Sequence, residues 1–153
     1  MTNLQKTLRR LKSEIAAVDG LDEYTIFGSS ALILRKIVDR EPGDLDVMTT
    51  KRVWGNLLPR KGWEVETPKA GDPPMLARHD WPVLVNVFFD WSSPAAEIDP
   101  DYLLATSEEV NGVRLASVDE VLRHKEEAAA YGTKVRKHKA DIRKIEEHMA
   151  VVV

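Results

Sequence analysis

Residues 24–49, YTIFGSSALILRKIVDREPGDLDVMT, decide the fold. The first four residues suit a β-strand, and Gly28-Ser29 follows them as a tight turn. A helix is expected to start near Ser30. After it, a charged loop closed by Pro-Gly leads into a second strand that carries two aspartates. This order of strand, turn, helix, loop and strand predicts an α/β protein whose functional groups gather around the Gly-Ser turn.

The two aspartates of the second strand, Asp44 and Asp46, are expected to point to the same face of the sheet, because side chains alternate along a strand. Neighbouring carboxylates repel each other. A hard divalent cation removes this conflict, and Mg²⁺ binds carboxylate oxygens together with phosphate oxygens. The pair therefore predicts a Mg²⁺ site.

The turn before the helix predicts a second kind of site. Gly28 lets the backbone approach a ligand closely. Ser29 and Ser30 lie at a helix N-terminus, whose free N–H groups can hold a phosphate. A phosphate site beside a metal-binding acid pair indicates a site for a nucleoside triphosphate.

This arrangement resembles the nucleotidyltransferase superfamily, whose hallmark is Gly-Ser or Gly-Gly, a short helical spacer and Asp-x-Asp on the next strand. Here the spacer between Gly28-Ser29 and the acid pair is a little longer than is usual in that family. The resemblance implies an enzyme that transfers a nucleoside monophosphate from a nucleoside triphosphate, with Asp44 and Asp46 as catalytic metal ligands. It also implies that Arg40 contacts a phosphate. The alternative for Arg40 is an ordinary charge on a loop surface.

The length and composition of the chain predict one soluble domain over 1–153. The resemblance implies that this domain is nucleotidyltransferase-like, with a core over 20–116 and C-terminal helices over 117–149. The net charge of −3 does not by itself indicate a nucleic-acid-binding protein. The chain contains no cysteine, which excludes disulfides and thiolate metal sites and is compatible with a cytoplasmic protein. No apolar run approaches the roughly 18 residues that a membrane span needs.

The strongest strand signal covers residues 83–89, VLVNVFF, which are apolar on both faces apart from Asn86 and therefore belong in the sheet interior. Polymerase-like relatives carry a third carboxylate on such a strand. Two interpretations stay open. Asp90, at the strand end, is the third catalytic acid; alternatively Asn86 occupies the acidic position and the third acid is missing, which puts two-metal chemistry in doubt.

The remaining pattern predicts a small mixed sheet with helices mainly on one face, followed by a C-terminal helical pair. Asn111-Gly112 indicates a type I′ hairpin turn. Ser117 begins a capping box. The expected helices are 2–18, 30–38, 51–58, 117–131 and about 133–149; the expected strands are 24–27, 44–49, 63–67, 83–89 and the two arms of 108–115, with a further edge strand at 75–79.

The C-terminal part resembles the AbiEii/MenT-like branch of the superfamily, in which a helix carries an inward lysine and the next helix carries Lys-Asp-x-x-Asp-Ile. Lys125 corresponds to that lysine and Asp141 to the second aspartate. His138 stands at the position of the first aspartate. The resemblance implies that Lys125 binds triphosphate as a catalytic residue and that Asp141 orients Lys125 or the nucleotide. The alternative for Lys125 and for Lys137 is a solvated helix surface. It is favoured for Lys137 unless the acceptor is a nucleic acid, in which case a local basic patch is expected.

Several acceptors stay open. The AbiEii/MenT-like branch implies a toxin-like enzyme that modifies tRNA and has a cognate antitoxin. A small-molecule acceptor, as in antibiotic nucleotidyltransferases, needs the same core. An MNT-type antitoxin would instead transfer AMP to a partner toxin, and a degenerate member of the fold would bind a partner without catalysis. Asn86 and His138 are the residues that favour the degenerate alternative.

Overall fold

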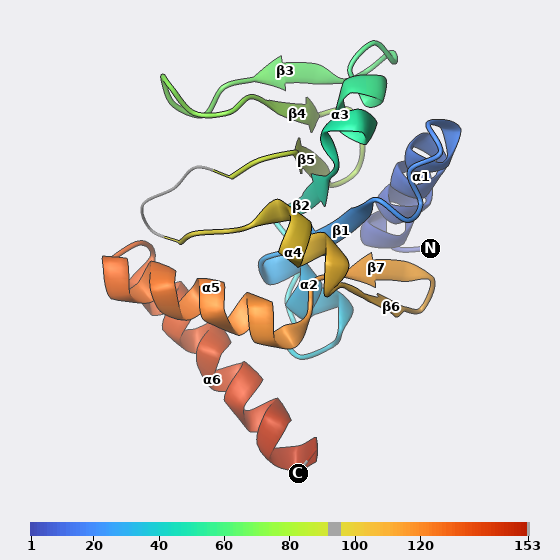
Figure 1. The fold of residues 1–153 in the computed structure, drawn as a ribbon. Coiled ribbons are helices and arrows are strands. Elements are labelled where there is room, and N and C mark those ends of the chain that lie inside the picture. Colours follow the sequence, from blue (N-terminus) through green and yellow to red (C-terminus); the bar gives the residue numbers. More distant parts are fainter. Residues whose placement is uncertain (92–95, 153) are drawn as a thin grey trace.

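The computed structural model describes residues 1–91 and 96–152, and Figure 1 shows the arrangement of its helices and strands. Strands and helices alternate through most of the chain, and two longer helices close it. In chain order the elements are α1 (Asn3–Ala17), β1 (Tyr24–Phe27), α2 (Ser29–Leu34), β2 (Asp44–Thr49), α3 (Lys51–Leu57), β3 (Glu64–Glu66), β4 (Met75–Arg78), β5 (Leu84–Phe88), α4 (Pro100–Ala105), β6 (Glu108–Val110), β7 (Val113–Leu115), α5 (Val118–Tyr131) and α6 (Val135–Val152).

The strands form one mixed sheet in the order β3-β4-β5-β2-β1-β7-β6. β2 pairs in parallel with β5, β1 pairs in parallel with β7, and the other pairings are antiparallel. The predicted α/β class with a mixed sheet is confirmed. The interior position of residues 83–89 is also confirmed, because β5 lies between β4 and β2. The expected edge position of residues 75–79 is wrong, since β3 pairs on the outer side of β4 and is itself the edge.

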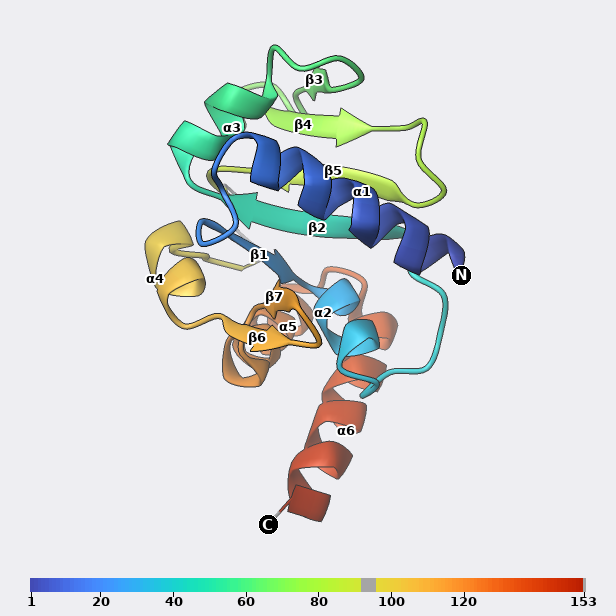
Figure 2. The same cartoon turned by 90° about the vertical axis from the view of Figure 1, so that its right-hand side faces the viewer.

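Helices cover both faces of the sheet, but most of them lie on one face, as expected, because α2, α4, α5 and α6 share one side. α1 and α3 pack on one face, where Leu11, Ile15 and Leu57 are fully buried against the strands. Figure 2 shows α1 crossing that face. The remaining helices pack against the other face, around Leu32, Leu103 and other buried side chains. The sequence pattern predicts which side of a helix is apolar, but it does not predict which face of the sheet that side packs against.

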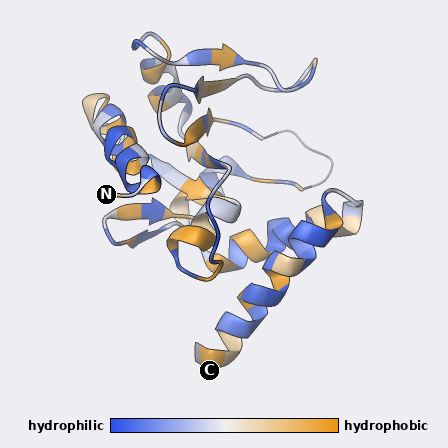
Figure 3. Ribbon diagram, turned by 180° about the vertical axis from the view of Figure 1, so that it is seen from behind, coloured by the Kyte–Doolittle hydropathy of each residue, from blue (hydrophilic) through white to orange (hydrophobic). Residues whose placement is uncertain are grey.

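The C-terminal helices form an antiparallel pair beside the second face, and the end of α6 projects away from the sheet (Figures 1 and 2). Ser117 caps α5 by accepting a hydrogen bond from the backbone N–H of Glu120. Gly132 ends α5 in the left-handed conformation, as expected of a C-terminal glycine. Figure 3 shows a largely hydrophilic α6 with an apolar C-terminal end. In the described part of the chain, no helix is both long and apolar enough to span a bilayer.

Candidate active site

The predicted turn lies between β1 and α2, and its backbone requires glycine. Gly28 has φ +69° and ψ −154°, a conformation that residues with a side chain rarely adopt. A Cβ atom at this position would lie 3.7 Å from Oδ2 of Asp46. Phe27 pairs with Asp46 across the two strands. The turn therefore brings bare backbone next to one carboxylate of the acid pair.

The acid pair faces the turn from β2. In the parallel pairing with β5, Asp44 lies opposite Leu84, and Asp46 lies opposite Asn86. Nδ2 of Asn86 donates a hydrogen bond to Oδ2 of Asp44 at 3.3 Å. Burial, followed by the negative charge of Asp44, raises the pKa of Asp46 to about 7. Asp46 is therefore only partly ionised at neutral pH, because it is buried beside Asp44.

The residues present fit a hard divalent cation. Two carboxylates and an amide side chain lie together, and these are the oxygen ligands that Mg²⁺ prefers. Neither Asp44 nor Asp46 forms an ion pair with any described residue, so the protein itself does not neutralise the pair. A cation between the carboxylates would remove the repulsion that raises the pKa of Asp46. Asn86 could supply its carbonyl oxygen to the ion if its side-chain amide rotated by about 180°, because the rotation exchanges the amide nitrogen and oxygen.

Asp90 lies two residues beyond the end of β5 and is exposed. Its Oδ1 accepts a hydrogen bond from the backbone N–H of Trp91 at 2.8 Å. Together with Asp44, Asp46 and Asn86 it lines a groove of about 350 Å³. Asp90 therefore lies at the rim of the region that holds the acid pair, whereas Asn86 occupies the strand position opposite Asp46. Its role as a third acid stays a prediction.

On the other side of the turn, four residues from distant parts of the sequence form a polar cluster around the buried carboxylate of Asp141. Nζ of Lys125 donates to Oγ of Ser29 at 2.6 Å and lies 3.0 Å from Oδ2 of Asp141. Oγ of Ser29 in turn donates to Oδ2 of Asp141 at 3.1 Å. Arg40 binds both oxygens of Asp141, at 2.8 Å and 3.1 Å. The cluster joins the loop before β2 and the start of α2 to both C-terminal helices.

The charges of this cluster depend on one another. Lys125 is 5% exposed and Asp141 only 1%. Burial would raise the pKa of Asp141, but hydrogen bonds from Arg40 and Lys125 outweigh it and lower that pKa to about 2. Burial lowers the pKa of Lys125, while Asp141 opposes the shift. Because Asp141 faces two cations, the cluster keeps a net positive charge at neutral pH, which suits a phosphate ligand.

A cavity of about 290 Å³ connects the cluster to the acid pair. Its wall includes the turn, both aspartates and Lys125, so the cavity brings together most of the residues that the sequence predicts for the site. Asp141 does not line this cavity, and Arg40 lines an adjoining pocket of about 350 Å³ that also includes Ser29 and Asp44. The cavity is lined by Phe27, Gly28, Ser29, Ser30, Asp44, Asp46, Trp91, Ala96, Ile98, Val121, His124, Lys125, Ala128, Thr133, Lys134, Lys137 and His138.

Sequence reasoning gave no role in the site to four of these residues, which are His124, Lys134, Lys137 and His138. Lys134 and Lys137 line the cavity, although a basic run on a helix usually indicates a solvated surface. Lys137 precedes Asp141 by one helical turn, and this spacing could have placed it on the inward side of α6. His138 also lines the cavity. Burial, followed by the charges of Lys125 and Lys137, lowers its pKa to about 4, so the imidazole is neutral at pH 7.

The overall structure corresponds to that of a known class of enzymes, the nucleotidyltransferases. No protein-family model and no curated protein matches the sequence. Among solved structures, the crystal structure of the nucleotidyltransferase ANT(2'')-Ia in complex with adenylyl-2''-tobramycin is similar, with a TM-score of 0.65 and 18% identity over 95% of this chain and 90% of that chain. The solution structure of this antibiotic-resistance factor gives a TM-score of 0.66 and 18% identity over 97% and 86%. At this identity the similarity establishes the fold, which is nucleotidyltransferase-like.

Proposed function

We propose that the protein is a Mg²⁺-dependent nucleotidyltransferase that transfers a nucleoside monophosphate from a nucleoside triphosphate to an acceptor. One observation carries the proposal: a single cavity is lined by Asp44 and Asp46 from β2 and by Lys125 and Lys137 from the C-terminal helices. A triphosphate with a divalent cation needs both kinds of group at once. The nucleotidyltransferase-like fold supports the same activity.

Each residue would have a defined task. In the reaction an acceptor hydroxyl oxygen bonds to the α-phosphorus, the bond from that phosphorus to the β-phosphate oxygen breaks, and pyrophosphate leaves. Bound Mg²⁺ would supply Lewis-acid stabilisation of the phosphate charge. Asp44 and Asp46 would hold the ion, while Gly28, Ser29 and Lys125 would orient the distal phosphates. Asp90, at the rim, would position the acceptor hydroxyl and receive its proton.

The resemblance noted in the sequence makes tRNA the predicted acceptor, and the cationic residues of α6 near the cavity are compatible with a nucleic-acid backbone. A specific observation favours a second candidate, a small molecule that carries amino groups. The groove on the outer side of the acid pair adds Asp72 and Asp90 to its wall and has Lys69 as its one cationic residue among those described. An acidic groove attracts a cationic acceptor and repels RNA. The structurally similar ANT(2'')-Ia is in complex with an adenylylated aminoglycoside, adenylyl-2''-tobramycin.

Label transfer tests the proposal. The protein is incubated with Mg²⁺ and each α-labelled nucleoside triphosphate, together with total tRNA, a panel of aminoglycosides and polyamino alcohols, or co-purified protein. Asp44→Asn and Asp46→Asn are expected to lower the transfer at least about a hundredfold, because each removes a ligand of the ion. Asp39→Asn, an exposed acid in the preceding loop, serves as the matched control and is expected to keep full activity.

The acceptor that takes the label decides between the candidates. Label on tRNA supports the toxin-like enzyme, label on an amino-containing small molecule supports the second candidate, and label on a partner protein supports an MNT-type antitoxin. Absence of transfer to every acceptor, together with absence of nucleotide binding by calorimetry, would contradict the proposal. Nucleotide binding without transfer would instead identify the degenerate member of the fold.

A further inference from the structure

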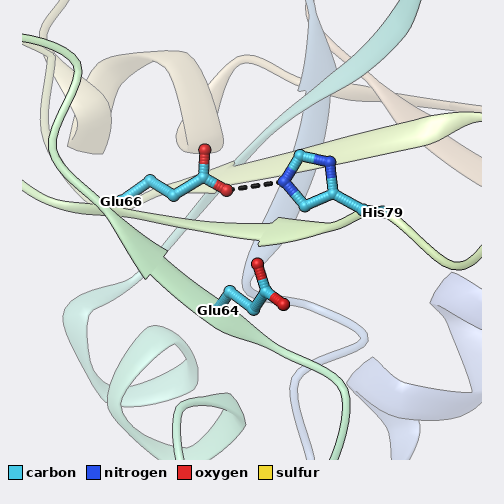
Figure 4. A group of neighbouring side chains, drawn as sticks. All are labelled: Glu64, Glu66 and His79. Carbon is cyan, nitrogen blue, oxygen red and sulfur yellow. Dashed lines mark hydrogen bonds and ion pairs between the residues drawn. The ribbon is translucent and has the colours of Figure 1, made fainter.

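A second group of potential metal ligands lies at the outer edge of the sheet, on β3 and just after β4 (Figure 4). Glu64 and Glu66 are two residues apart on β3 and therefore face the same side. His79 follows β4, the strand that pairs with β3. One carboxylate oxygen from each glutamate and one ring nitrogen of His79 all lie within 4.8 Å of one another.

The carboxylates of this group have few other partners. Nε2 of His79 lies 2.6 Å from Oε2 of Glu66, and Glu64 forms no ion pair with any described residue. Arg78, the neighbour of His79, directs its guanidinium to Asp80 and stacks on a tryptophan ring. Among the described residues the two glutamates are thus balanced by one imidazole, which leaves a local excess of negative charge.

The group is separate from the acid pair of the active site. The strand pairings give a row across the sheet from Glu64 to Ala77, from Ala77 to Asn86 and from Asn86 to Asp46. Three steps at the usual spacing of strands place the backbones of Glu64 and Asp46 about 14 Å apart. One metal ion cannot bridge that distance, so the edge group would hold an ion of its own.

We propose that Glu64, Glu66 and His79 form a binding site for a divalent transition-metal ion of the zinc type. Zinc takes imidazole nitrogen and carboxylate oxygen at about 2.0–2.2 Å, which puts neighbouring ligand atoms of a tetrahedral ion about 3.3 Å apart. The observed atoms need only small movements of side chains to reach this spacing. His79 is 53% exposed and Glu66 37%, so both can move and water can complete the coordination.

The ligand set also selects the kind of metal. Mg²⁺ prefers a shell of oxygen atoms, whereas an imidazole ligand favours zinc and its neighbours in the transition series. The chain has no cysteine, so no thiolate competes for such an ion. A bound ion would tie the edge strand β3 to the segment that follows β4. The site would therefore stabilise the folded protein as well as bind metal.

Titration with Zn²⁺ alone tests this site. Binding is followed by equilibrium dialysis and by NMR of the histidine side chains, of which the chain has four. Zinc binding at the acid pair is excluded in two ways. One titration uses the Asp44→Asn/Asp46→Asn double variant, and the other uses wild-type protein whose acid pair is saturated with Mg²⁺. We expect one bound zinc ion, a shift of the His79 resonances and an increase in the melting temperature with Zn²⁺.

Variants identify the ligands. His79→Ala and Glu66→Gln are expected to weaken zinc binding about tenfold or more. His148→Ala removes an exposed histidine from α6 and is expected to leave zinc binding unchanged. The proposal is overturned if the His79 resonances do not move while zinc binds, or if His79→Ala binds zinc as tightly as the parent protein. These outcomes are independent of nucleotidyl transfer, because none of the three residues lines the cavity of the active site.

Discussion

Asp46 links metal binding to pH, because burial and Asp44 raise its pKa to about 7. Below pH 7 the folded protein carries a proton on this carboxyl group, and a cation must displace it. We expect Mg²⁺ affinity to rise about tenfold per pH unit up to pH 7 and to level off above it. Calorimetry at about pH 6, in buffers of different ionisation enthalpy, should detect the release of about one proton per bound ion.

A pH-independent affinity below pH 7, or binding without proton release, would contradict this prediction. Asp39→Asn is the control, since the exposed side chain of Asp39 lies outside the site and its loss should change neither quantity.

Asp141 differs from Asp46 in that its carboxylate stays ionised and binds two cationic side chains, Arg40 and Lys125. Replacing Asp141 with Asn leaves Lys125 and Arg40 facing each other without a carboxylate. Removing one partner of a buried ion pair is costly, and we expect the free energy of unfolding to fall by about 3 kcal/mol. Urea denaturation measures the change. The matched control is Glu146→Gln, on an exposed position of the same helix, which should cost less than about 0.5 kcal/mol.

The turn between β1 and α2 requires a glycine at position 28. Gly28 has positive φ and its missing Cβ faces Asp46. Gly28→Ala is therefore expected to lower the free energy of unfolding by about 1–3 kcal/mol and to weaken nucleotide binding. Gly55→Ala provides a control of opposite sign, because Gly55 is exposed within α3 and has an open space around it. It should stabilise the protein by about 0.5–1 kcal/mol. Equal effects of the two substitutions would refute the argument.

The elements could be predicted from the sequence where local chemistry decides them. The strand of residues 83–89 has apolar side chains on both faces, and the Asn111-Gly112 turn has positive φ at both residues, as predicted. The interior position of β4 in the sheet could not be predicted, because no feature of residues 75–79 indicates that β3 pairs with the outer side of β4. The sequence also did not say which helices form the minority on the other face, and these are α1 and α3. An apolar stripe shows that a helix packs against the core, but it does not show which face of the sheet the helix covers.

The candidate site was predictable to the extent that its residues are close in sequence. The turn and Asp-x-Asp lie within one short stretch, and the structure places them in contact. Arg40 and Asp141 are about a hundred positions apart, and no local pattern records their pairing. The resemblance pointed to Lys125 and Asp141, but the bidentate bond from Arg40 appears only in the structure.

At the scale of the whole molecule, the active site depends on how α6 is attached. Ile145 is fully buried and joins α6 to the core beneath the second face of the sheet. Ile145→Ala is expected to lower the free energy of unfolding by about 3 kcal/mol, because it leaves a cavity in that core. Val151, 86% exposed on the same helix, gives the control: Val151→Ala should change the stability by less than about 0.5 kcal/mol. Equal costs at the two positions would mean that α6 does not depend on this contact.

The long separation between Arg40 and Asp141 has a consequence for the time at which activity can arise. Translation produces the Gly-Ser turn, Arg40 and both aspartates well before the helix that carries Asp141. Until then Lys125 and Arg40 have no buried carboxylate to hold them, so the growing polypeptide on the ribosome has the catalytic sequence but not the assembled phosphate site. A fragment of residues 1–134, free of the ribosome, should therefore bind triphosphate more weakly than residues 1–153 do.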